Sequence, residues 1–296
     1  MLQTDIFTHA QPSISPALQP LELREKEYSP SSAIGGNYQP FIQAYVDRSA
    51  EANAQVKCIK DLRYAEAERA LIDYFPAPHT SSGEAPGLLV FIHGGYWQEL
   101  SKNESAFLAP AWHTAGFAHA VVGYTLAPQA RIGEIVAQCR AALAYLRDQA
   151  STLGFDPQRI VVAGSSAGGY LAAACAADAS LAIAGCVPIS GVFDLRPLVG
   201  TSINEALGMT MQEAAELSGL TKGASRVPSV IAWGQIETKA FKQQSQALAA
   251  HLHASGQTCE ALEIAGRNHF DVVDELGDAQ SALFAAAMKL FEQRIG

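Results

Sequence analysis

The sequence predicts an α/β fold with a mostly parallel central sheet flanked by helices. From about residue 86 onward, short apolar runs alternate with longer segments of helical spacing, as strands and helices do in βαβ units. The strand runs, such as "LLVF" and "RIVV", are apolar throughout, which is typical of strands covered on both faces. The chain has 296 residues, 49% hydrophobic and 17% charged, a balance that supports one large packed domain.

Residues 1–55 are predicted to form an N-terminal strap or lid outside the sheet. This part is rich in proline and irregular up to residue 38. Between residues 38 and 55, Phe41, Tyr45 and, more weakly, Ala52 are spaced along one face of a helix.

Residues 56–296 are predicted to form the main domain, which opens with a strand pair at 56–64 and 69–77. Each later element follows from its own apolar pattern and from the turn residues at its ends. We expect further strands at 86–95, 119–126, 159–165, 183–190, 228–234 and 259–266, and helices at 104–116, 132–151, 167–179, 239–256 and 279–295. A polar helical stretch at about 195–225 is predicted to form a cap-like insertion.

Composition excludes several partners. A net charge of -9 and a pI near 5.4 argue against nucleic acid and anionic membranes, and favour a small neutral or cationic substrate. The first residues do not resemble a secretory signal, so a cytoplasmic location is expected. Five scattered cysteines and the lack of a metal-binding motif predict no disulfide framework, no metal and no cofactor. The oligomeric state is left open, a homodimer included.

The stretch "GSSAGG" at 164–169 carries the first chemical signal. Gly164, Ser166 and Gly168 match G-x-S-x-G between a predicted strand and a predicted helix, the setting of a nucleophilic serine on a sharp turn. Ser165 would then serve the turn. The same residue types also occur in ordinary turns. The motif therefore indicates a nucleophilic serine only because it lies between a predicted strand and a predicted helix.

His269 is the predicted general base. Three histidines follow Ser166, and two of them, His251 and His253, fall at the end of a helix. His269 stands in "GRNHFD", after the last strand, at the sheet edge where the carboxyl ends of parallel strands gather ligands. The alternative is a loop histidine that caps the following helix.

The acid that orients the base has two candidates. Glu237 in "WGQIETKAF" directly follows a strand, in the order serine, acid, histidine that such sites use. Asp194 in "SGVFDLRPL" follows the preceding strand, and its other interpretation is a helix cap or an ion pair with Arg196. Glu237 is preferred.

The segment "FIHGGYW" predicts an oxyanion hole. Gly94 and Gly95 let backbone N–H groups approach a substrate oxygen, and the N–H of Ala167 would join them. Tyr96 and Trp97 are candidates for the substrate pocket, although packing in the core is an equal alternative for both.

With these motifs, residues 56–296 resemble the α/β-hydrolase superfamily. The closer similarity is to the kynurenine formamidase (arylformamidase) branch and its bacterial esterase-like relatives. The stretches that carry it are "EYSPS" (27–31), "HGGYW" (93–97), "GSSAGGYLAA" (164–173), "SGVFDLRPL" (190–198), "ETKAFKQQS" (237–245) and "NHFD" (268–271).

The resemblance implies metal-free hydrolysis of N-formyl-L-kynurenine to L-kynurenine and formate in tryptophan catabolism. It also implies a catalytic triad of Ser166, His269 and the acid position. Two positions depart from the branch, which usually has aspartate in place of Glu237 and often histidine in place of Ser165. The alternatives are a carboxylesterase or thioesterase acting on small acyl esters, and a ligand-binding protein on a disused hydrolase fold. The retained serine, histidine and glycines disfavour the binding protein.

Overall fold

A computed structural model describes residues 19–78, 84–218 and 227–292. The first 18 residues of the predicted strap, the end of the predicted cap-like insertion and the last residues of the final predicted helix lie outside the described residues.

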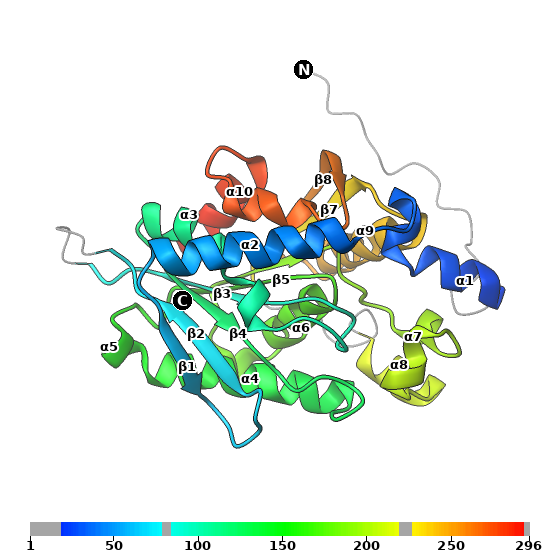
Figure 1. Ribbon diagram of the computed structural model, residues 1–296, viewed down its shortest axis with the longest axis horizontal. Helices are drawn as coiled ribbons and strands as arrows, with labels where there is room; N and C mark the ends of the chain where they lie inside the picture. The colour runs from blue at the N-terminus through cyan, green and yellow to red at the C-terminus, as the bar shows by residue number, and fades with distance from the viewer. Residues whose placement is uncertain (1–18, 79–83, 219–226, 293–296) are drawn as a thin grey trace.

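The core of the fold is an eight-stranded sheet in the order β1-β2-β4-β3-β5-β6-β7-β8. β1–β2 and β2–β4 are antiparallel, and all other neighbours are parallel, which confirms the predicted mostly parallel sheet (Figure 1). The strands are β1 Ile59–Arg63, β2 Leu71–Phe75, β3 Leu88–Ile92, β4 Ala118–Val122, β5 Ile160–Ser165, β6 Gly185–Ile189, β7 Ser229–Ile236 and β8 Cys259–Asn268.

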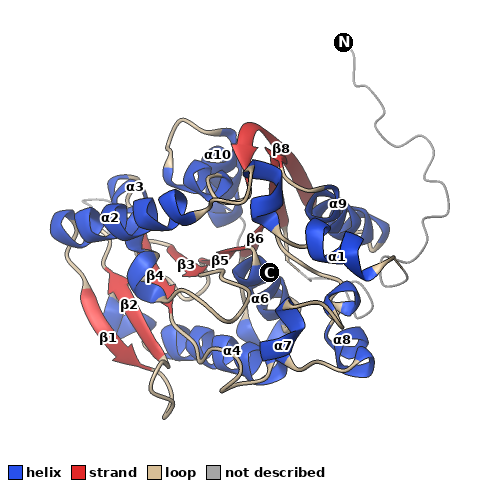
Figure 2. Cartoon of the chain, turned by 45° about the vertical axis from the view of Figure 1, so that its right-hand side comes forward, coloured by secondary structure: helices blue, strands red, loops and turns tan. Residues whose placement is uncertain are grey.

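Helices cover both faces of this sheet (Figure 2). The α-helices are α1 Leu21–Glu27, α2 Gln39–Gln55, α3 Ala109–Thr114, α4 Ile132–Asp148, α5 Ala150–Leu153, α6 Ala167–Ala176, α7 Ile203–Leu207, α8 Met211–Leu217, α9 Lys239–Ala254 and α10 Ala282–Lys289. The predicted helix over 104–116 is divided into 3-10 turns at Lys102–Glu104 (η3) and Ala106–Leu108 (η4), followed by α3. None of the described helices is long and apolar enough to cross a membrane.

Strand β3 shows why the two helical layers form. Leu88, Val90 and Ile92 belong to the core cluster that includes residues of α4 and α6. Leu89 and Phe91 belong to the cluster that includes residues of α3 and α10. Because successive side chains of a strand point to opposite faces, an unbroken apolar strand needs a helical layer on each side.

The described part of the N-terminal segment lies outside the sheet. It contains α1, the 3-10 turn η2 at Pro30–Ile34, and α2. α1 lies beside α9, and α2 runs past η3 and η4 (Figure 1). The region of the cap-like insertion contains α7 and α8, on the same side of the molecule as α1.

Candidate active site

Ser166 occupies the turn between β5 and α6. Its φ of 56° and ψ of -121° lie in a region that a residue with a side chain rarely adopts. A Cβ on Gly164 would stand 2.2 Å from the carbonyl oxygen of Gly168, and one on Gly168 would stand 2.0 Å from that of Ile92. Both glycines of the motif are therefore required by close contacts between backbone segments, and the turn presents Ser166 above the sheet.

Strand register brings Glu237 and His269 together. In the parallel pair β7–β8, Ile236 is level with Asn268, so the residues that follow the two strands are neighbours. His269 Nδ1 lies 3.2 Å from Glu237 Oε2. Since a carboxylate only accepts hydrogen bonds, Nδ1 is the donor of this bond, and Nε2 lies on the other side of the ring.

Glu237 is held by two further donors. Ser190 Oγ and the Gly234 backbone N–H donate to its Oε1 at 2.5 Å and 2.6 Å. The side chain of Glu237 has no exposed surface, so these bonds compensate for its burial. Sequence reasoning did not single out Ser190, which directly follows β6 with a φ of 49°. The only local feature of the sequence that could have indicated this role is the position of the serine of "SGVF" at the end of a predicted strand.

The turn that carries His269 is braced by its own side chains. Asn268 Oδ1 accepts from the N–H groups of Phe270 and Asp271 at 2.8 Å and 3.3 Å, while Asp271 Oδ1 accepts from the Asn268 N–H at 2.6 Å. Asparagine and aspartate favour such turns because they can bond to nearby backbone groups. This pattern explains the "NHFD" stretch and could have been predicted from those two residue types.

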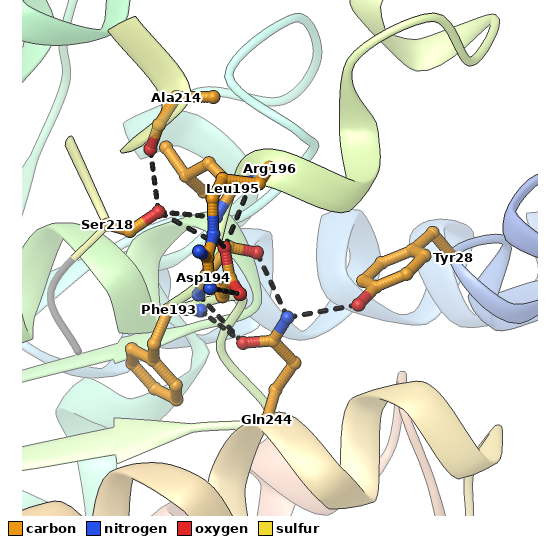
Figure 3. A network of polar contacts seen from close by, with 8 residues as sticks. All are labelled: Tyr28, Phe193, Asp194, Leu195, Arg196, Ala214, Ser218 and Gln244. Atoms are coloured by element: carbon orange, nitrogen blue, oxygen red, sulfur yellow. Dashed lines mark hydrogen bonds and ion pairs between the residues drawn. The ribbon is translucent and has the colours of Figure 1, made fainter. Parts of the chain in front are cut away.

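Asp194 belongs to a different network, shown in Figure 3. Its Oδ2 accepts from Arg196 Nη2 at 2.7 Å, and its Oδ1 accepts from Arg196 Nε at 2.8 Å and from Ser218 Oγ at 3.3 Å. The ion pair with Arg196 is the alternative interpretation that the sequence left open for Asp194. The structure places Glu237, not Asp194, against His269.

The glycines of "HGGYW" lie against the serine turn. A Cβ on Gly94 would stand 2.8 Å from the Ser165 carbonyl oxygen and 3.1 Å from Ser166 Cβ. Gly95 has a φ of 89°, and a Cβ there would stand 2.3 Å from the Glu99 carbonyl oxygen. Ala167, the third residue predicted for the oxyanion hole, is the first residue of α6.

His93 braces this glycine loop. Its Nδ1 donates to the Gly94 carbonyl at 2.9 Å, and its ring stacks on Tyr124 with centroids 4.2 Å apart. Burial lowers the pKa of His93 to about 4. The ring is therefore neutral at physiological pH.

A cavity of about 460 Å³ joins these groups. Ser166, His269, Gly94 and Gly95 line it, with aromatic and aliphatic side chains around them. Of the two pocket candidates next to the glycines, Tyr96 lines the cavity. Trp97 is instead fully buried in the main core cluster and packs edge-on against Tyr170, with centroids 5.5 Å apart. A volume of this size accommodates a small organic molecule.

Two family models match the chain. One, described as BD-FAE, matches residues 74–188. The other, described as the prolyl oligopeptidase family, matches residues 133–293, more than half of the chain. The chain belongs to this family of α/β-hydrolases.

Curated relatives narrow the position of this α/β-hydrolase. The kynurenine formamidase of Danio rerio is 28% identical over 282 residues, which are 91% of this chain and 94% of the relative. The kynurenine formamidase of Drosophila melanogaster is 29% identical over 234 residues, covering 73% of this chain and 76% of the relative. The α/β-hydrolase therefore falls in the kynurenine formamidase-like branch.

A solved structure is also similar over nearly the whole chain. A candidate thioesterase from Silicibacter sp. TM1040 superposes with a TM-score of 0.79 at 29% identity, covering 91% of the α/β-hydrolase and 100% of the other chain. Ser166, His269, Glu237 and the glycine loop thus lie in a fold that this candidate thioesterase shares.

Proposed function

We propose that the protein is a serine hydrolase that cleaves N-formyl-L-kynurenine to L-kynurenine and formate. The observation that carries this proposal is the Glu237–His269 contact on the cavity that Ser166 also lines. The choice of substrate is inferred from the similarity to a kynurenine formamidase, which covers 91% of this chain.

The proposed reaction starts at the hydroxyl of Ser166. Nε2 of His269 takes the proton while Oγ forms a bond to the formyl carbon, and Glu237 stabilises the resulting imidazolium. The N–H groups of Gly94, Gly95 and Ala167 supply hydrogen bonds to the oxyanion. The charge that develops on the carbonyl oxygen is therefore balanced by fixed donors.

Collapse of this intermediate breaks the C–N bond. His269 returns its proton to the leaving aniline nitrogen, which gives L-kynurenine and a formyl ester on Ser166. A water molecule then loses a proton to His269 and attacks the ester, so that formate leaves and the Ser166 hydroxyl is restored.

A second candidate is hydrolysis of small acyl esters or thioesters. The same three side chains would act on an ester carbonyl, and the Silicibacter structure at 29% identity is described as a candidate thioesterase. The difference lies in which leaving group the cavity accepts.

The test is kcat/KM on N-formyl-L-kynurenine beside p-nitrophenyl acetate and butyrate, with Ser166→Ala as the blank. A value of about 10⁴ M⁻¹s⁻¹ or more for the formamide supports the first candidate. Cleavage of the esters alone would replace it with the second, and no Ser166-dependent turnover of any of them would overturn both.

A further inference from the structure

The N-terminal segment contacts both sides of the Glu237–His269 pair. Residues of this segment from Glu25 to Tyr45 line the cavity, so it forms part of the pocket wall. Its side chains also bond to the turn that carries His269 and to the helix that follows Glu237. These contacts are made to Phe270 and Thr238, the residues that directly follow His269 and Glu237.

On the base side, one face of α2 holds Phe270, the residue after His269. The Phe270 ring stacks on those of Tyr38 and Phe41, with centroid distances of 5.4 Å and 5.6 Å and nearly parallel planes. The Tyr45 hydroxyl donates to the Phe270 carbonyl oxygen. These residues recur every three or four positions, so they share one helical face.

The same face continues to an ion pair. Arg48 Nη1 lies 2.6 Å from Asp274 Oδ1, just beyond the turn, and the Arg48 guanidinium lies over the Phe107 ring at 4.9 Å. The Tyr45 ring also stacks on Phe107, with centroids 5.0 Å apart. Residues at the start of α2 and along it therefore contact both the turn that presents His269, at Phe270, and the segment just beyond it, at Asp274.

On the acid side, the end of α1 holds the start of α9. The carbonyl oxygen of Glu27 accepts from Thr238 Oγ1 at 2.6 Å, and its carboxylate accepts from the Ala240 N–H at 2.9 Å. Tyr28 Oη accepts from Gln244 Nε2 at 3.1 Å (Figure 3). Thr238 directly follows Glu237, so α1 is bonded to the residue next to the acid.

Gln244 extends this clamp to the loop after β6. Its Oε1 accepts from the N–H groups of Phe193 and Asp194, at 2.9 Å and 2.8 Å. That loop begins with Ser190, which donates to Glu237. Gln244 Nε2 also donates to the Asp194 carbonyl oxygen at 3.0 Å, so all four hydrogen-bonding positions of this buried amide join the segments around the acid.

Phe241 connects this helix to the base. Its ring meets the His269 ring edge-on, with centroids 4.5 Å apart, and the Tyr28 ring packs against it at 6.2 Å. Movement of α1 away from α9 would remove support from the ring that contacts His269.

We propose that residues 27–48 position the Glu237–His269 pair, with Tyr45 and Tyr28 as positioning residues, in addition to forming a wall of the cavity. This inference rests on the proposed serine-hydrolase function. A wall alone affects substrates that touch it, whereas a positioning segment affects the attack of Ser166 on every electrophile, however small.

The experiment removes single atoms and uses a small probe. Tyr45→Phe and Tyr28→Phe each delete one hydroxyl, and Tyr74→Phe is the matched control, because the Tyr74 hydroxyl donates to the Leu153 carbonyl in another part of the core. The rate of covalent labelling of Ser166 by a small fluorophosphonate is measured, together with kcat and KM for p-nitrophenyl acetate. Unfolding midpoints establish that each variant is folded.

We expect Tyr45→Phe to slow labelling about three- to tenfold and to lower kcat by a similar factor with KM nearly unchanged, because a small displacement of a catalytic group is costly. Tyr28→Phe should show a smaller effect in the same direction, and Tyr74→Phe should match the wild type. Arg48→Met should behave like Tyr45→Phe, with recovery in Arg48→Lys.

Unchanged labelling rates in folded Tyr45→Phe, Tyr28→Phe and Arg48→Met would overturn the inference, even if KM rose for larger substrates. The proposed function would survive that result, because the wild type is still labelled at Ser166. A wild type that is not labelled at Ser166 would overturn both.

Discussion

Ser190 donates a hydrogen bond of 2.5 Å to the oxygen of Glu237 that does not face His269. The carboxylate is therefore held by a residue that directly follows β6 on one side and meets His269 on the other. The Gly234 N–H is a second donor to the same oxygen, at 2.6 Å.

The first prediction concerns Ser166, the proposed nucleophile. Ser166→Ala should lower kcat by at least about 10³-fold, since the activated hydroxyl and its base act as a unit. The unfolding midpoint should be unchanged or slightly higher, because alanine removes a polar group from a nearly buried position. Turnover near the wild-type rate would show that another residue is the nucleophile.

Substitution of each candidate acid, Glu237 and Asp194, shows which one acts with His269. Glu237→Gln should lower kcat by about 10²–10⁴-fold, because an amide cannot stabilise the imidazolium as a carboxylate does. Asp194→Asn should mainly lower stability, since Arg196 loses its charged partner. Steady-state rates and urea midpoints of both variants test this. The acid role would pass to Asp194 if only its variant lost activity.

The space around two glycines predicts how alanine substitutions there affect stability. Gly168→Ala should lower both the unfolding midpoint and the yield of active protein, because the new methyl would stand 2.0 Å from the Ile92 carbonyl oxygen. Gly133→Ala in α4 is the control: its nearest contact would be 4.0 Å away, and helix propensity should add about 0.5–1 kcal/mol of stability. Equal midpoints for both variants would contradict the packing argument.

Two buried histidines predict that the fold loses stability in acid. Burial lowers the pKa of His93 to about 4 and that of His119 to about 3, so below the ordinary value near 6.5 the unfolded chain binds more protons than the folded one. Each contributes about 1.4 kcal/mol of lost stability per pH unit from pH 6.5 down to its folded pKa.

Urea unfolding between pH 7.5 and 5 tests this. His119→Phe should show a shallower fall than the wild type, because one of the two titrations is gone. His253→Gln, on the exposed end of α9, is the surface control. A slope that is the same in His119→Phe would refute the assignment.

The charge around the cavity predicts a substrate preference. Glu25, Glu99 and Glu104 line it, and among the described lining residues none is lysine or arginine. At low salt we expect butyrylcholine to be cleaved about tenfold faster, as kcat/KM, than a butyrate ester of similar size that carries a carboxylate. The uncharged 3,3-dimethylbutyl butyrate should fall between them. Glu99→Gln should narrow the difference, and faster cleavage of the anionic ester would contradict the prediction.

Local pattern was enough for the sheet and for most of the candidate site. Unbroken apolar runs predict buried parallel strands, and G-x-S-x-G between a strand and a helix predicts the turn that presents Ser166. The sequence pattern did not decide whether Trp97 lies in the cavity or in the core, because an aromatic residue beside a glycine loop can face either one. The contact with Tyr170 from α6, distant in the sequence, places it in the core.

The sequence by itself determined the order of the elements and the residue types at the carboxyl ends of the strands, because spacing and turn chemistry are local properties. Tertiary structure alone decided which acid meets His269. Gly234 pairs with Ile264 and Ile236 pairs with Asn268, so β8 advances four positions where β7 advances two. This irregularity in β8 brings Glu237 and His269 level with each other. Register between strands is set by packing and long-range hydrogen bonds, and these exist only once the chain has folded.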